Sequence, residues 1–245
     1  TRGAFIELMG IEQKDADGNK TDMTTVDAMI TNKTDVMLST IAGDPAAIGY
    51  VSLGSLNDNV KALQIDGAEA TAENVKSGTY KVARPFNIAT KGEPTGVAKD
   101  FINYILSADG QKIVSEDYIS ISDDAAAFET DGSSGKIVVG GSSSVFPLME
   151  KLAEGYEAIN GAAEIEVQSS DSTAGMSGAA DGTFDIGMAS RALKDDEAAQ
   201  LTGTVIANDG IAVIVNNENA ISGLTSEQVQ KIYTGEITDW SEVAE

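Results

Sequence analysis

The segment KIVVGGSSSVFPLMEKLAEGY at residues 136–156 decides the fold, because it contains a complete strand–turn–helix unit. Its apolar start, 136–140, predicts a short buried strand, and a turn of three serines, 142–144, follows. Pro147 fits the first turn of a helix, where its missing N–H costs nothing. Apolar side chains then recur at the spacing of one helical face: Leu148, Leu152, Tyr156 and Ile159.

The alternation of strands and helices continues on both sides of this unit. Downstream, the patterns predict strands at 164–168, 184–188 and 204–216, helices at 174–180 and 194–201, and a capping box at 225–228. Upstream, they predict helices at 1–9, 23–30 and 97–118 and strands at 36–41, 48–53 and 81–90. This order predicts an α/β fold.

Composition narrows the classes of function. A chain of 245 residues with 42% hydrophobic residues suits one large domain or two small lobes with a real core. No apolar run is long enough to span a membrane, and the helical pattern that starts at Thr1 gives no sign of a signal peptide. A formal net charge of −23 argues against a nucleic-acid partner. The absence of cysteine and histidine excludes thiol catalysis, disulfides and the Ser-His-Asp triad.

Two serine-rich turns are the best candidates for a binding site. Ser142, Ser143 and Ser144 precede one predicted helix, and Ser172 and Thr173 precede another. A helix N-terminus presents N–H groups and a partial positive charge, and hydroxyls beside it add neutral donors, so such turns suit a small oxyanion. Ordinary helix capping is the alternative for either turn alone. Two such turns on neighbouring strand ends favour an anion site.

Two charged residues follow or precede the later strands. Arg191 either faces the same anion or forms a surface ion pair with Asp195 or Asp196. Asp209 either caps a turn before the long strand or accepts a proton from a protonated anion. Both residues are therefore kept as candidate ligand-binding residues, each with a structural alternative.

Two further segments carry weaker signals. Thr1 and Arg2 open a helical pattern, and a guanidinium there could clamp an oxyanion through two hydrogen bonds. The run Asp15–Asn19 resembles a calcium loop, but its glycine comes too early for an EF-hand, so a solvent-exposed turn is expected. No metal site, catalytic nucleophile or cofactor is predicted.

These segments together resemble the phosphate-binding proteins of bacterial ABC transporters. The amino-terminal half of that family is similar to 136–156, VQSSDSTAGM at 167–176, FDIGMASRALKDDE at 184–197, NDGIAVIVNN at 208–217 and LTSEQVQKIYTGEITDW at 224–240. The carboxy-terminal half is similar to TRGAFIEL at 1–8, DPAAIGYVSLGSL at 44–56, ARPFNIATKGEP at 83–94 and FINYILSADGQKIV at 101–114. In this chain the segments similar to the carboxy-terminal half come first, so the order of the two halves is rotated relative to that family. We interpret the chain as spanning the junction between two tandem domains, with an engineered or processed permutant as the alternative.

The resemblance implies a two-lobed fold of the periplasmic-binding-protein type, in which each lobe is a sheet flanked by helices and the ligand cleft lies between them. Residues 60–215 are expected to form one continuous lobe, with SDDAAAFETDGSSG at 122–135 as an exposed acidic linker. Residues 1–59 and 216–245 are expected to form the second lobe, lacking one strand. Another copy of the chain or an adjacent tandem domain could supply that strand by exchange.

The resemblance also implies where phosphate would bind. Its contacts would be Ser142 to Ser144 and Ser172 on one lobe, and Thr1 and Arg2 on the other. Some relatives have an aspartate at the position of Arg191, and such an aspartate accepts the proton of hydrogen phosphate and excludes sulfate. If Arg191 faces the ligand, selectivity would instead depend on Asp171, Asp209 or a segment that has no counterpart here.

The resemblance therefore implies an extracytoplasmic solute-binding protein that captures inorganic phosphate and delivers it to an ABC permease. It would be a non-enzymatic protein without a cofactor, at the cell surface or in the periplasm, with a lipid anchor as one possible attachment. Two alternatives stay open: a binding module for another oxyanion such as sulfate or molybdate, and a surface interaction or sensory module that does not transport.

Overall fold

The computed structural model describes residues 1–15 and 20–243. The chain divides into two compact units: unit 1 consists of Thr1–Ala83 and Gly210–Glu245, and unit 2 of Arg84–Asp209. Each unit combines strands with helices, so the predicted α/β class is confirmed. The run Asp15–Asn19 lies largely outside the described residues, and its expected turn stays a prediction.

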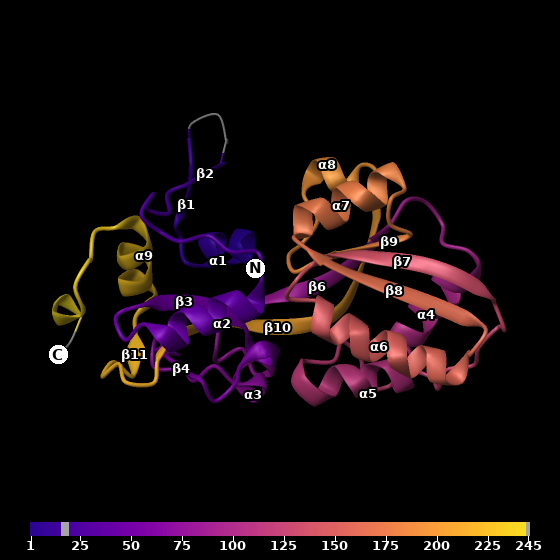
Figure 1. Cartoon of the computed structure of the whole chain (residues 1–245), viewed down its shortest axis with the longest axis horizontal. Helices are drawn as coiled ribbons and strands as arrows, with labels where there is room; N and C mark the ends of the chain where they lie inside the picture. Colours follow the sequence, from indigo (N-terminus) through magenta and orange to yellow (C-terminus); the bar gives the residue numbers. More distant parts are fainter. Residues whose placement is uncertain (16–19, 244–245) are drawn as a thin grey trace. The chain divides into compact units, whose positions relative to one another are not determined.

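Unit 2 is a sheet with helices on both faces (Figure 1). Its strands lie in the order β6, β9, β7, β8, where β7 is parallel to β8 and β9, and β6 is antiparallel to β9. Helices α4, α5 and α6 cover one face, and α7 and α8 cover the other. The bounds are β6 Ala83–Thr90, α4 Gly96–Leu106, α5 Ala108–Asp117, β7 Gly135–Ser142, α6 Phe146–Ile159, β8 Ala163–Ser170, α7 Ser172–Asp181, β9 Ile186–Ala189, α8 Asp195–Ala198 and β10 Thr202–Asn216.

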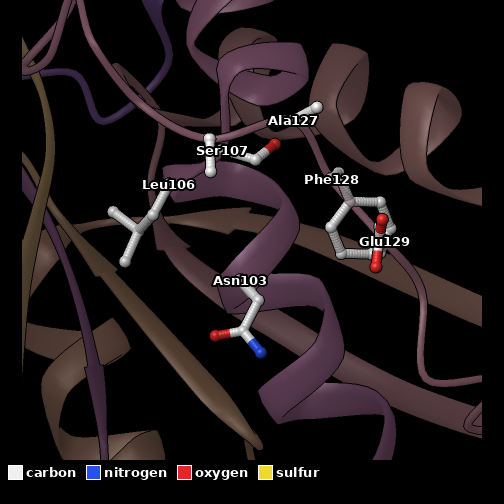
Figure 2. Close-up of a pocket in the computed structure, with 7 residues that line it drawn as sticks. Asn103, Leu106, Ser107, Ala127, Phe128 and Glu129 are labelled. Carbon is white, nitrogen blue, oxygen red and sulfur yellow. The ribbon is translucent and has the colours of Figure 1, made fainter.

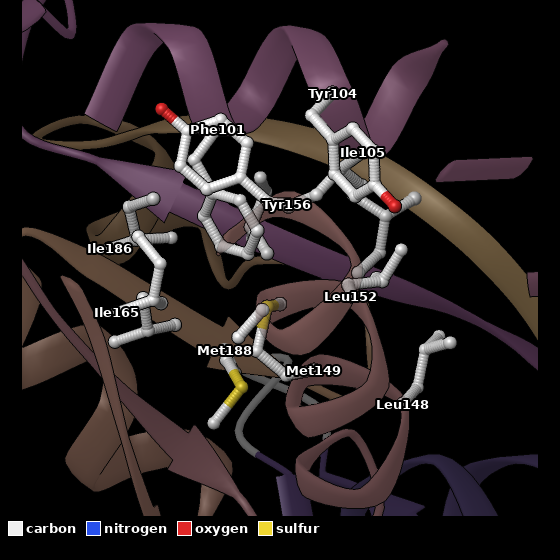
Figure 3. Close-up of a cluster of buried hydrophobic side chains, with 14 of the residues drawn as sticks. Phe101, Tyr104, Ile105, Leu148, Met149, Leu152, Tyr156, Ile165, Ile186 and Met188 are labelled. Carbon is white, nitrogen blue, oxygen red and sulfur yellow. The ribbon is translucent and has the colours of Figure 1, made fainter. Parts of the chain in front are cut away.

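The core of unit 2 lies where α4 and α6 pack on the sheet (Figure 3). Of the helical face predicted at Leu148, Leu152, Tyr156 and Ile159, the first three side chains are fully buried, whereas Ile159 at the end of α6 is 49% exposed. The three buried side chains meet Phe101 from α4 and strand residues such as Ile186. The strand–turn–helix unit read from the sequence is therefore confirmed, because its apolar period matches the face that the sheet covers.

Unit 1 is built from both ends of the chain. The second part of β10 pairs antiparallel with β3 and β4, and β11 pairs parallel with β5. The bounds are α1 Arg2–Leu8, β1 Glu12–Lys14, β2 Lys20–Asp22, α2 Thr34–Gly43, β3 Ile48–Ser52, β4 Val60–Ala62, β5 Gln64–Ile65, α3 Ala72–Lys76, β11 Gly223–Leu224 and α9 Ser226–Thr234, with 3-10 helices at Leu53–Ser55 and Trp240–Glu242.

The boundaries of the units differ from the predicted ones. The sequence placed 60–215 in one lobe, but the structure assigns 60–83 and 210–215 to unit 1. The reason is packing: Leu63 and Tyr80 share a buried cluster with Val213, and the Tyr80 hydroxyl donates a 2.7 Å hydrogen bond to the carbonyl oxygen of Ile211. That unit 1 lacks one strand stays a prediction.

Two local predictions were wrong in the 23–41 region. The helix expected at 23–30 is a turn-containing loop in which Val26 is 99% exposed, and the strand expected at 36–41 is part of α2. A short, nearly continuous apolar run does not distinguish a strand from a helix by its period, so the packing of Ile41 against Val51 and Ile214 decides it.

The segment at 122–135 is not a loose linker. Residues 122–134 have no helix or strand, and Gly135 begins β7. The segment is largely exposed, as expected, but it lies within unit 2 and is attached to it. Phe128 contacts the rings of Tyr104 and Tyr156, and the buried Asp100 carboxylate accepts hydrogen bonds from the Thr130 hydroxyl and the Asp131 backbone N–H. These anchors make it a strap across the helices of unit 2.

Candidate functional site

Three parallel strands of unit 2 bring the predicted serine turns to one edge of the sheet. Ser142 at the end of β7 lies opposite Ser170 at the end of β8, and Gly141 lies opposite Met188 in β9. The Ser143 backbone N–H donates a 3.1 Å hydrogen bond to the carbonyl oxygen of Ser170. The two turns are therefore neighbours, as the sequence predicted.

The first turn leads into α6 without a side-chain cap. Val145 occupies the N-cap position and caps no N–H through its side chain, and a proline lies in the first turn. The buried Ser142 hydroxyl accepts a 3.3 Å hydrogen bond from the Ser144 N–H. Among the described residues, the half-buried Ser143 hydroxyl has no hydrogen-bond partner. This helix N-terminus, with a hydroxyl in front of it, retains donor capacity for an anion.

The second turn uses much of its donor capacity internally. Asp171 is the N-cap of α7, and its carboxylate accepts hydrogen bonds from the backbone N–H groups of Thr173 (2.8 Å) and Ala174 (2.9 Å). The Thr173 side chain is exposed. The expectation that both helix N-termini present open N–H groups is therefore wrong for α7, because the aspartate before it already satisfies two of them.

Ser172 connects the second turn to the end of β9. Its hydroxyl accepts a 3.1 Å hydrogen bond from the Ser190 backbone N–H and lies 3.4 Å from the Ser190 hydroxyl, and both serines are buried. The sequence did not single out Ser190, although it follows β9 as Ser142 ends β7. Asn87 in β6 was also missed; its side-chain amide donates a 2.9 Å hydrogen bond to the Arg191 carbonyl oxygen.

Glycines allow α7 to approach the strand ends closely. A Cβ on Gly175 would lie 2.6 Å from the Met188 carbonyl oxygen and 2.8 Å from the Cα of Gly141. Gly141 itself has a φ of +140° and could not carry a Cβ without meeting the same carbonyl oxygen at 2.3 Å. Backbone atoms cannot rotate out of the way, so these positions require glycine.

Arg191 forms an ion pair, but neither of the expected partners is the one used. Its Nη1 and Nη2 atoms lie 2.7 Å from the two carboxylate oxygens of Glu197, and Nη1 also donates to the Ala192 carbonyl oxygen at 3.0 Å. The side chains of Arg191 and Glu197 are only 14% and 11% exposed. The prediction of a surface pair with Asp195 or Asp196 is therefore wrong. The partner is Glu197, the third residue of α8, whose carboxylate also accepts a 2.8 Å hydrogen bond from the Lys194 N–H.

Asp209 does not stand in a turn before the long strand. It lies within β10, is fully buried, and places its Oδ2 atom 3.3 Å from Nη2 of Arg84. The Arg84 guanidinium also lies over the Phe86 ring, 5.4 Å from its centroid. Because a buried charge needs a partner, this carboxylate serves the Arg84 ion pair, and the predicted capping role is wrong.

Thr1 and Arg2 belong to unit 1, whereas the other candidate residues belong to unit 2. Thr1 is the N-cap of α1. The Arg2 guanidinium pairs with Asp22 through Nε at 2.9 Å and Nη2 at 2.7 Å. Burial raises the pKa of Asp22, but hydrogen bonds from Thr24 and the charge of Arg2 outweigh it and leave that pKa below its ordinary value. The edge of the Arg2 guanidinium formed by Nε and Nη2 is therefore already occupied by Asp22.

No metal centre is evident, since no cluster of three potential ligands occurs in residues 1–15 and 20–243. A groove of about 640 Å³ lies elsewhere in unit 2, between α4 and the strap (Figure 2). Asn103, Leu106 and Phe128 are among its lining residues, and none of the predicted site residues is. The candidate site is defined by the strand ends and not by this groove.

Comparison with known proteins places the chain in a family. Residues 126–245 match the PBP superfamily domain. A phosphate-binding protein PstS 2 from Streptococcus agalactiae is 53% identical over 247 residues, which cover 100% of this chain and 84% of that protein. The chain belongs to the PstS family of phosphate-binding proteins.

A solved structure of this PstS family supports the same assignment. The phosphate-binding protein of a phosphate ABC transporter from Streptococcus pneumoniae TIGR4 has a TM-score of 0.79 and 42% identity, over 99% of this chain and 95% of that one. The predicted fold of the periplasmic-binding-protein type is thereby confirmed. Within the described residues, every helix is too short or too polar to cross a bilayer.

The PstS comparisons also bear on the rotated order of segments. The match to the S. agalactiae protein runs along the whole chain, so that relative has its segments in the same order. Since 84% of that relative lies inside the match, it has no room for a second domain of this length. The comparison therefore gives no support to the interpretation as a junction between tandem domains, and the rotated order is shared with that relative.

Proposed function

We propose that this protein binds inorganic phosphate outside the cytoplasm and delivers it to an ABC permease, without catalysing a reaction. The observation that supports the proposal most is the edge of unit 2 where β7, β8 and β9 end. It gathers serine hydroxyls and the N-terminus of α6, which has no side-chain cap. Such neutral donors suit a small oxyanion, and relatives that span the chain carry the name phosphate-binding protein.

The proposed ligand contacts in unit 2 are Ser143, Ser142, Ser144, the Ser172 hydroxyl and Arg191. Thr1 and Arg2 in unit 1 are proposed as further contacts, although Arg2 must share its guanidinium with Asp22. Thr173 and Asp209 are weaker proposals. The Thr173 N–H already donates a hydrogen bond to Asp171, and the Asp209 carboxylate already forms an ion pair with Arg84. The net charge of −23 does not oppose binding, since salt screens charges beyond ~8 Å whereas these donors act at contact.

Calorimetric titration of phosphate into the dialysed chain, repeated in excess sulfate, tests the proposal. Saturable binding that resists sulfate is expected. Binding abolished by sulfate would replace the proposal with a general oxyanion site, and a folded chain that gives no heat with either anion would contradict transport and favour an interaction module. A parallel titration of the Arg2→Gln variant tests the contribution of unit 1. The proposal expects this substitution to weaken phosphate binding.

A further inference from the structure

We propose that Glu197 is a positioning residue that orients Arg191 and cancels its charge, and that it thereby sets how strongly the strand ends of unit 2 discriminate between singly and doubly charged oxyanions. The inference rests on the proposed function, because it takes Arg191 as a ligand contact. Glu197 itself is assigned no contact with the ligand.

The geometry of the pair leaves one edge of the guanidinium available. An arginine has five N–H donors in a planar arrangement. Both N–H groups of Nη1 and one of Nη2 are used by Glu197 and the Ala192 carbonyl oxygen. Within the described part of the chain, Nε and the second N–H of Nη2 make no hydrogen bond. These two groups form a second fork of the kind that matches an oxyanion.

The backbone of Arg191 is fixed beside the serines of the candidate site. The residue before it, Ser190, is hydrogen-bonded through its N–H to the Ser172 hydroxyl. The Arg191 carbonyl oxygen accepts a hydrogen bond from the side-chain amide of Asn87 on the adjacent strand. Because the main chain is held on both sides, Glu197 decides the direction of the remaining side-chain atoms.

The charges of the pair balance at neutral pH. Burial raises the pKa of Glu197, but hydrogen bonds from Arg191 and the Lys194 N–H, with the positive charges of both residues, outweigh it and leave that pKa below its ordinary value. The carboxylate is therefore ionised, and the pair as a whole is neutral. A neutral pair offers hydrogen bonds to an anion but little extra attraction for a second negative charge.

The test compares Glu197→Gln with the unaltered protein by titrating phosphate and sulfate at one fixed pH near neutrality. Sulfate is doubly charged there, whereas phosphate is a mixture of singly and doubly charged forms. Glutamine keeps the shape of the side chain but leaves the Arg191 charge unbalanced. The ratio of the sulfate Kd to the phosphate Kd is then expected to fall on the order of tenfold, as one added charge–charge interaction allows.

Two control variants separate charge from shape and from the general acidity of the chain. Glu197→Asp keeps the charge but shortens the reach, so it should weaken both anions and preserve their ratio. Glu227→Gln removes the same charge from an exposed pair with Lys231 in unit 1 and should leave the ratio unchanged. Thermal unfolding of each variant verifies that it is folded.

The outcomes distinguish this inference from the function on which it rests. If the unaltered protein binds no phosphate, the proposed function fails. If it binds phosphate and Glu197→Gln leaves the sulfate-to-phosphate ratio unchanged, the role of Glu197 is wrong while the function stands. A ratio that falls equally in Glu227→Gln would also overturn it, because the effect would then come from net charge alone.

Discussion

The two serine turns of unit 2 look alike in sequence but use their groups differently. In the first turn, α6 starts without a side-chain cap, and the Ser143 hydroxyl has no partner among the described residues. In the second, the Asp171 carboxylate accepts hydrogen bonds from two N–H groups at the start of α7, and the Ser172 hydroxyl oxygen accepts one from the Ser190 N–H. A serine-rich turn before a helix therefore offers its backbone N–H groups to a ligand only where no acidic cap already engages them.

Replacing Gly175 by alanine should give the largest effect, because it breaks the close approach of α7 to the strand ends. The new Cβ would meet backbone atoms of Met188 and Gly141, which cannot move aside alone. We expect a loss of about 2–3 kcal/mol in the free energy of unfolding, measured by thermal or denaturant unfolding. Gly161→Ala is the matched control, since its Cβ comes no nearer than 4.0 Å to another atom. Equal stability of the two variants would contradict this account of the packing.

Removing the cap of α7 should make the second turn more like the first. Asp171→Ala leaves the N–H groups of Thr173 and Ala174 without their acceptor, which should cost about 1 kcal/mol of stability. The same change exposes two donors and removes a negative charge, so phosphate affinity should rise. Asp171→Asn is the control, because it keeps an acceptor oxygen and should lose less stability. Weaker phosphate binding in Asp171→Ala would show that Asp171 takes part in recognition.

Alanine at the two serines should separate binding from stability. Ser143→Ala should leave unfolding within about 0.5 kcal/mol of the unaltered chain, since its hydroxyl bonds to no described residue, yet weaken phosphate binding roughly tenfold. Ser172→Ala should cost about 1 kcal/mol of stability as well, because the buried Ser190 N–H loses its acceptor. Calorimetry and thermal unfolding of both variants measure the difference. A Ser143→Ala variant with unchanged affinity would remove the first turn from the site.

The third strand end should add a smaller, pH-dependent contribution. The pKa of Glu197 lies below its ordinary value of 4.5 in the folded chain, so its carboxylate stabilises the fold above that value. This contribution is lost as the pH falls through the folded-state pKa. The stability difference between the unaltered chain and Glu197→Gln should therefore shrink on acidification from neutral pH, as thermal unfolding at several pH values would show. A difference that stays constant would mean that the pair does not depend on ionisation.

Structural features were predictable from the sequence where the interacting residues are close together in the chain. The capping box at Thr225 and Gln228 is present as predicted, because both partners lie within one helical turn. The neighbouring serine turns were also found, since parallel strands end at one edge. The partner of Arg191 was not predictable, because in a chain with 39 acidic residues sequence spacing does not choose between Asp195, Asp196 and Glu197. The partner of Asp209 was not predictable either, because Arg84 lies far from it in the sequence.

The sequence by itself determined the α/β class, the strand–turn–helix unit at 136–156 and the resemblance to phosphate-binding proteins, because periodicity and short motifs are properties of neighbouring residues. Only the tertiary structure decided which donors are already engaged, that the 122–135 segment is a strap, and that 60–83 joins unit 1. Those features depend on contacts between residues far apart in the chain. Packing and the pairing of buried charges select among such contacts, and no local pattern encodes that selection.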